Sequence, residues 1–146
     1  PSLDYPLVYD MKEQFPKLHI SLNGGVKSIR EADNLLSKGV DGVMIGRSAY
    51  QQPSEILSNI DKVIFKEKTL TSPFEVADDM RGYIHDHFEN GGNPHQVTRH
   101  MMGLFHGLPG AKVWRQLLSH ASSSNNLDFF DEALHAVRNS VTTAAA

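Results

Sequence analysis

The sequence contains no cysteine among its 146 residues. Disulfides, thiolate metal sites and a cysteine nucleophile are therefore excluded within these residues. No apolar run approaches the roughly 18 residues that a membrane span requires, and the N-terminus lacks a signal-peptide pattern. We therefore expect a cytoplasmic protein with no membrane partner. We also expect no metal site, because His85 and His87 would point different ways on a helix and lack a carboxylate at ligand spacing.

A strong charge imbalance is also missing, since the formal net charge is only −3. The overall balance does not indicate a nucleic acid or a membrane, and we expect no DNA partner. The first residue is Pro1 instead of methionine, and the opening residues read as the middle of a fold. We therefore expect a fragment with further strands before Pro1, because two strands alone would leave exposed sheet edges.

The first 65 residues alternate helical and strand patterns, which predicts a parallel α/β fold. Ser28 is expected to cap one helix in a capping box with Glu31. The second strand is apolar throughout, which is typical of a sheet buried on both faces. The expected elements are helix 6–15, strand 19–22, helix 29–38, strand 42–45 and helix 53–65.

The remaining residues show only helical periods, and four helices with short loops predict a small bundle. Trp114 is expected to lie in its core. The helices are expected at 74–89, 94–107, 111–121 and 128–140. The predicted domains are a β/α part at 1–65, a linker at 66–73, a helical domain at 74–141 and a frayed tail at 142–146.

Two loops that follow the predicted strands carry features of anion binding. In the first, Asn23-Gly24-Gly25, paired glycines expose backbone N–H groups next to a helix N-terminus, although a tight turn is the alternative. In the second, Gly46-Arg47, the arginine offers bidentate geometry for phosphate, although a surface ion pair is the alternative. Taken together they favour phosphate, since the last two loops of β/α barrels build such a site.

Residues 90–127 contain no Asp or Glu, although about four acids would be expected from the chain average. This stretch is suited to a phosphate backbone, although the acids could be absent by chance. Val97, Met101, Leu104 and Phe105 are expected on the buried side of helix 94–107, and His95, Arg99 and His106 on its other face. The basic residues and histidines of the stretch are Arg99, Lys112, Arg115, His95, His100, His106 and His120.

Two segments of the sequence carry a family resemblance. Residues 21–28 (SLNGGVKS) with 40–53 (VDGVMIGRSAYQQP) resemble the FMN-phosphate end of tRNA-dihydrouridine synthases. Residues 97–115 (VTRHMMGLFHGLPGAKVWR) resemble the helical-domain signature of the A subfamily. The resemblance extends over about residues 3–140 and implies an α/β fold, namely the last two β/α units of a TIM-type (β/α)8 barrel followed by a C-terminal α-helical bundle.

The resemblance implies an enzyme that reduces D-loop uridines of tRNA, at positions 20 and 20a, to 5,6-dihydrouridine. FMN would be the cofactor and NADPH the co-substrate. The cofactor-binding residues would be Asn23, Gly24, Gly25, Gly46 and Arg47. The tRNA-binding residues would be Arg99, His100, Lys112 and Arg115, with Lys112 where the family often has arginine.

In this family the catalytic cysteine, which acts as general acid, and the lysine and histidine beside the flavin lie upstream of these segments. We therefore expect no catalytic residue in this chain and no activity from it in isolation. We also expect a monomer. Two alternatives stay open. One is another FMN- or phosphate-binding barrel oxidoreductase that acts on a small molecule, and the other is a non-catalytic RNA-binding remnant.

Overall fold

The computed structural model describes residues 2–119 and 126–145. The chain divides into two compact units, one made of residues 1–50 with 55–70 and the other of residues 51–54 with 71–146. Each unit has a hydrophobic core of its own. No helix among the described residues is long and apolar enough to cross a membrane.

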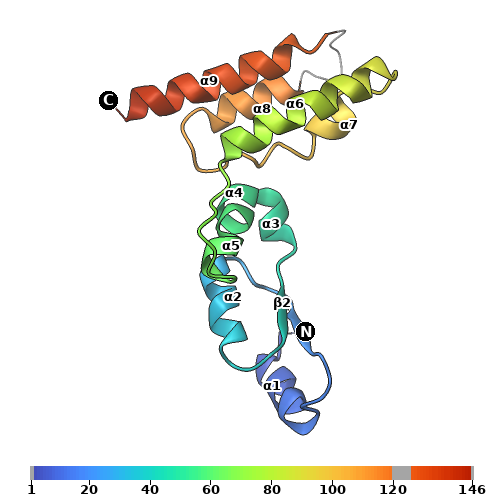
Figure 1. The fold of residues 1–146 in the computed structure, drawn as a ribbon, viewed down its shortest axis with the longest axis vertical. Helices are drawn as coiled ribbons and strands as arrows, with labels where there is room; N and C mark the ends of the chain where they lie inside the picture. The colour runs from blue at the N-terminus through green and yellow to red at the C-terminus, as the bar shows by residue number, and fades with distance from the viewer. Residues whose placement is uncertain (1, 120–125, 146) are drawn as a thin grey trace. The chain divides into compact units, whose positions relative to one another are not determined.

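The first unit is built around a parallel β–α–β arrangement, as the sequence predicts (Figure 1). Leu22 pairs with Val43 across the two strands, and the helix between the strands packs against the second strand. The first elements are α1 (Tyr5–Gln14), β1 (Ser21–Asn23), α2 (Ile29–Leu36), β2 (Gly42–Met44) and α3 (Arg47–Gln51).

The helix α2 begins at a side-chain cap. Ser28 Oγ accepts a hydrogen bond from the backbone N–H of Glu31 at 3.1 Å, as predicted. The reciprocal bond differs from the predicted capping box, because the Glu31 carboxylate accepts from the N–H of Lys27 at 2.9 Å and not from that of Ser28. Both bonds satisfy N–H groups that have no partner within the helix, so they fix where α2 starts.

Asp41 joins the starts of the two strands. Its carboxylate accepts a hydrogen bond from the N–H of Ile20 at 2.8 Å and an ion pair from Lys12 at 2.7 Å. The backbone N–H of Asp41 donates in turn to the carbonyl of Ile20 at 3.0 Å. The Ile20 N–H and then the Lys12 ammonium hold the pKa of Asp41 below its usual value, because both favour the charged carboxylate.

The core of the first unit is small. Met44 in β2 is 52% exposed, so the prediction of a strand buried on both faces is wrong for the described residues. The apolar run in β2 is therefore not matched by cover on both sides within this unit. Its cluster of buried residues consists of Leu22, Val26, Ala32, Leu35 and Val40, and Ile56 is buried outside this cluster.

The prediction of a single helix at 53–65 is wrong. The chain forms α4 (Pro53–Ile56), a 3₁₀ turn (Leu57–Asn59) and α5 (Ile60–Val63) instead. A 3₁₀ turn has three residues per turn, so it changes the direction of side chains along the segment. Ile56 is buried, whereas Ile60 and Ile64 are half-buried.

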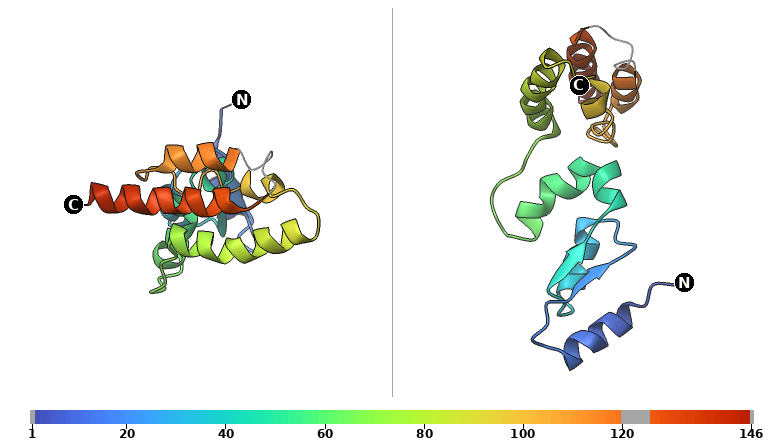
Figure 2. Two further views of the ribbon diagram at one scale, coloured as in Figure 1. Left: turned by 90° about the horizontal axis from the view of Figure 1, so that it is seen from above. Right: turned by 90° about the vertical axis from the view of Figure 1, so that its right-hand side faces the viewer.

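The second unit is helical in its described residues. Its long helix α6 begins with a full capping box, in which Ser72 and Glu75 each accept a backbone N–H. In both views of Figure 2, α9 lies between α6 and α8. The helices are α6 (Pro73–Glu89), α7 (His95–Thr98), α8 (Ala111–Ser119) and α9 (Asp128–Ala144).

The prediction of a helix at 94–107 is wrong, because only His95–Thr98 of this segment is α-helical. The chain then continues as successive turns whose backbone hydrogen bonds join residues three apart, such as Met101 to Thr98 and Leu104 to Met101. Gly107, the last residue of the predicted helix, has a φ of 78°, which an α-helix does not accommodate. The predicted shared helical face of His95, Arg99 and His106 therefore does not form.

Two helix ends also differ from prediction. The helix α9 runs to Ala144, so the expectation of a frayed tail is wrong for residues 142–144. The hydroxyls of Thr142 and Thr143 bond to carbonyls four residues earlier, which satisfies them within the helix. The helix α8 ends at Ser119, and the predicted continuation to 121 lies outside the described residues.

Trp114 lies at the centre of the second core, as predicted, and is 0% exposed. Its indole N–H donates to the carbonyl of Met101 at 2.9 Å, which satisfies the only polar atom of the side chain. Phe105 and Phe130 pack edge-on against the indole with ring centroids 4.8 and 5.6 Å away. The other buried residues are Ala77, Ile84, Met101, Leu104, Ala111, Leu118, Phe129, Ala133, Leu134 and Val137.

Candidate functional site

The two predicted phosphate loops leave the sheet at the same edge. Asn23 is opposite Met44 at the ends of parallel β1 and β2. The chain then continues into Gly24-Gly25 on one strand and into Ile45-Gly46-Arg47 on the other. The sequence predicts Asn23 as the first residue of the loop, whereas in the structure it is the last residue of β1. Parallel pairing therefore brings the two segments to one side of the unit.

Gly24 and Gly25 take a backbone conformation that other residues rarely adopt, with φ of 121° and 71°. A Cβ at either position would lie within 2.8 Å of a methyl group of Leu3. Gly46 differs, because its φ is not positive and its nearest neighbour would be the Met44 Cε at 3.6 Å. The positive φ therefore favours glycine at 24 and 25, since the exposed Leu3 side chain could move aside, whereas position 46 leaves room for a side chain.

The N-terminal end of α1 holds the first loop in place. The Tyr5 hydroxyl donates to the carbonyl of Gly24 at 2.5 Å. Leu3 covers the same two glycines. Sequence reasoning missed this contact, because Tyr5 and Gly24 are 19 positions apart and no local pattern links them.

Arg47 is exposed at the first position of α3. No carboxylate of the described residues forms an ion pair with it, so the alternative of a surface ion pair finds no support within this part of the chain. A guanidinium without a carboxylate partner keeps its donors available to a phosphate.

The four predicted RNA-binding residues are all exposed and fall into two pairs. Arg99 and His100 follow α7, and the Arg99 Nε donates to the His100 Nε2 at 3.0 Å. Lys112 and Arg115 lie one turn apart on α8, whose buried residues are Ala111, Trp114 and Leu118. All four side chains belong to the second unit.

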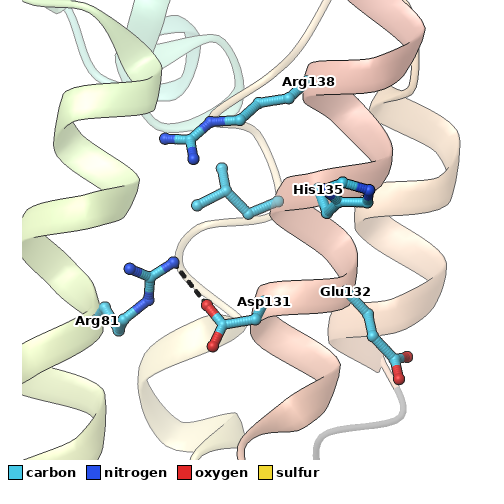
Figure 3. Close-up of a pocket in the computed structure, with 6 residues that line it drawn as sticks. Arg81, Asp131, Glu132, His135 and Arg138 are labelled. Atoms are coloured by element: carbon cyan, nitrogen blue, oxygen red, sulfur yellow. Dashed lines mark ion pairs between the residues drawn. The ribbon is translucent and has the colours of Figure 1, made fainter.

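A second group of charged residues lies between α6 and α9 (Figure 3). Arg81 pairs with Asp131 at 2.6 Å, and Arg138 pairs with Asp78 at 2.6 Å. Arg138 also lies over the ring of Phe74, with its guanidinium carbon 5.7 Å from the centroid. These charges are matched by one another, so the group ties α6 to α9 and offers little net charge to a ligand.

Comparison with known proteins assigns the family. The sequence model of the family described as dihydrouridine synthase (Dus) matches residues 1–142. The chain belongs to the dihydrouridine synthase family. The resemblance carried by residues 21–28, 40–53 and 97–115 is therefore confirmed.

Three relatives share the name tRNA-dihydrouridine(20/20a) synthase. The protein from Salmonella typhi is 46% identical over 129 residues, which is 88% of this chain and 38% of the relative. The protein from Shewanella oneidensis is 44% identical over 86% of this chain and 37% of its own length. The protein from Vibrio vulnificus is 42% identical over 82% of this chain and 36% of its own length. The chain thus spans little more than a third of the length of these relatives.

Proposed function

We propose that this chain is part of an FMN-dependent tRNA-dihydrouridine synthase that reduces D-loop uridines at positions 20 and 20a, with NADPH as reductant. The observation that carries the proposal is the shared edge of β1 and β2 in a member of this family. There, a positive-φ glycine pair follows β1, and an arginine without an ion-pair partner among the described residues begins the helix after β2.

The residues at this edge fit the phosphate of FMN. Asn23, Gly24 and Gly25 would bind it from the first strand, and Gly46 and Arg47 from the second. Backbone N–H groups and a guanidinium are the donors that phosphate oxygens prefer. The bound flavin would supply hydride to the uracil ring, and the role of these five residues is to anchor it through its phosphate.

We further propose that β1 and β2 are the last two β/α units of a TIM-type (β/α)8 barrel, at residues 1–65. Residues 66–73 would link it to a helical bundle, at residues 74–141, that binds tRNA. The boundary between the two compact units at 70/71 lies within this linker and supports the division, while residues 51–54 group with the second unit. Arg99, His100, Lys112 and Arg115 would contact the tRNA, which is negatively charged along its whole backbone. The protein would act as a monomer in the cytoplasm.

A hybrid enzyme tests the proposal. In it, this chain replaces the matching part of the Salmonella typhi relative, and the hybrid is produced in cells that lack their own 20/20a synthase. We expect dihydrouridine at positions 20 and 20a of the tRNA, measured by mass spectrometry of tRNA fragments. The hybrid with Arg47→Ala should yield less dihydrouridine, because the flavin phosphate loses a charged donor.

A hybrid that folds and binds FMN but leaves tRNA uridines unreduced would contradict the tRNA substrate. It would favour the alternative of a flavin barrel that acts on a small molecule. A hybrid that binds tRNA but retains no FMN would favour the alternative of a non-catalytic RNA-binding remnant. The unaltered relative in the same cells is the control for both outcomes.

A further inference from the structure

An apolar pocket of about 400 Å³ lies in the second unit between α6 and the segment that contains α7. His100 is the one residue of this lining that was also predicted to bind RNA, and no residue of the phosphate loops lines the pocket. Its walls are mainly apolar, with two polar side chains, which is the usual composition of a small-ligand site. The side chains that matter to its chemistry are Met80, Tyr83, Gln96, Val97, His100 and Met101.

Tyr83 is the unusual member of this lining, because 59% of its surface is exposed. Among the large hydrophobic side chains of the second unit that are described, only Tyr83 and Val113 are exposed. An aromatic ring at the mouth of an apolar pocket offers a flat face on which another flat ring can stack. Met80 and Val97 line the same pocket.

Two polar side chains contribute to the lining of this pocket. Gln96 is bonded through its amide oxygen to the His87 Nε2 at 2.9 Å, which fixes the orientation of the amide. His100 is bonded to the Arg99 Nε at 3.0 Å, so a permanent positive charge lies beside the lining. None of the described residues that line the pocket is acidic.

A flat apolar ring, hydrogen-bonding edges and an attached anion describe a nucleotide. We propose that this pocket binds an unstacked nucleobase of the RNA. Tyr83 stacks on the base, Gln96 and His100 face its edge, and Arg99 binds the adjoining phosphate. This proposal rests on the tRNA substrate proposed above and adds to it a base-binding site apart from the phosphate loops.

The test is a titration of the complete 146-residue chain with tRNA at two salt concentrations. Compared with the wild type, Tyr83→Leu should weaken binding about 5- to 150-fold, the usual effect of losing one base–aromatic stack. The loss should be equal at both salt concentrations, because stacking releases no counterions. Tyr83→Phe keeps the ring and should bind like the wild type.

Two variants serve as controls. Arg99→Gln should weaken binding more at low salt than at high salt, since it removes a phosphate contact. Phe15→Leu removes an exposed aromatic ring from the first unit and should change nothing. Circular dichroism of each variant checks that the helices are retained, and the exposure of Tyr83 makes their loss unexpected.

The outcomes separate this proposal from the one on which it rests. If the wild type binds tRNA with the expected salt dependence and Tyr83→Leu binds equally well, the pocket holds no base. If the wild type shows no salt-dependent binding, the tRNA-binding role of this chain is overturned and the pocket proposal falls with it. If Tyr83→Leu and Tyr83→Phe weaken binding alike, the hydroxyl and not the ring face is used, and stacking is contradicted.

Discussion

The two units of this chain bury their hydrophobic residues to different extents. The described part of the second unit has a core with three large aromatic side chains, Phe105, Trp114 and Phe130, that are at most 2% exposed. The core of the first unit contains no aromatic residue among its buried members. Among the described residues, exposed large hydrophobic side chains number two in the second unit and ten in the first, namely Leu3, Leu7, Met11, Phe15, Leu18, Met44, Tyr50, Leu57, Phe65 and Leu70.

This difference indicates that the second unit carries more of its stability within itself. A parallel pair of strands is normally covered on both faces, and here Met44 on β2 is half exposed. The first unit in contrast is held by particular polar contacts, such as Tyr5 with Gly24 and Asp41 with Ile20. Core substitutions should therefore have their largest effects in the second unit, and single hydrogen bonds should matter most in the first.

The largest effect is expected from Trp114→Ala in the second unit. The substitution removes a fully buried ring that contacts two others, and the free energy of unfolding should fall by about 3–5 kcal/mol. Urea unfolding followed by circular dichroism measures it. The adjacent Val113 is 38% exposed, so Val113→Ala is the control and should change the free energy by less than about 0.5 kcal/mol. If Trp114→Ala and Val113→Ala lowered the free energy of unfolding equally, the claim that the core around Trp114 stabilises the second unit would be refuted.

A glycine from each unit gives a matched pair of smaller effects. Gly39 and Gly110 both have positive φ, of 99° and 85°. A Cβ at Gly110 would lie 2.9 Å from the Val137 Cα, whereas one at Gly39 would meet nothing within 4 Å. Gly110→Ala should therefore cost about 1–3 kcal/mol more than Gly39→Ala, the usual range for overpacking. Thermal unfolding of both variants measures the difference, and equal costs would show that only backbone strain is involved.

A single hydroxyl in the first unit should have a weaker but specific effect. Tyr5→Phe removes the hydroxyl that donates to the Gly24 carbonyl. The ordered conformation of the loop should be destabilised by about 0.5–1.5 kcal/mol. In the hybrid enzyme this corresponds to FMN affinity lower by about 2- to 12-fold, measured by flavin fluorescence. The hydroxyl of Tyr9 is buried with no partner among the described residues, so Tyr9→Phe is the matched control. A larger loss of FMN from Tyr9→Phe would count against the loop contact.

The smallest effect is the pH dependence from Asp41. Its pKa is lowered in the folded chain, so its contribution is complete above the ordinary value of 3.8 and is lost as the pH falls through the folded value. We expect the first unit to weaken below about pH 4 in the wild type and to lose this part of the dependence in Asp41→Asn. Unfolding midpoints at pH 6 and pH 3 measure it. An unchanged pH dependence in Asp41→Asn would contradict the role of this carboxylate.

Local patterns in the sequence predicted the parts of the fold that depend on local physics. The Ser28 cap, the parallel order of β1 and β2 and the burial of Trp114 follow from short-range signals or from hydrophobicity. Met101, Leu104 and Phe105 were predicted to be buried and are, although not in a helix. Turns of three residues also bring such positions to one side, so the apolar spacing could not distinguish them from a helix.

Contacts between distant residues could not be predicted in this way. The hydroxyl of Tyr5 on Gly24, and the pocket that joins Tyr83 with His100, depend on how the units fold. The broken helix after Pro53 and the turns after Thr98 likewise reflect packing that overrides helical periodicity. The glycine pair and Arg47 were found from sequence because each lies in a loop that begins directly after a predicted strand.

The central claim is that the first unit anchors the flavin phosphate and the second binds RNA. FMN and tRNA affinities of the hybrid enzyme test it directly, in Arg47→Ala and in a triple variant with glutamine at Arg99, Lys112 and Arg115. Arg47→Ala should weaken FMN about 10- to 150-fold and leave tRNA affinity unchanged. The triple variant should keep FMN and lower the salt slope of tRNA binding by about 2–3. The division would be contradicted if either variant lost affinity for both FMN and tRNA. It would also be contradicted if both variants kept their affinity for both ligands.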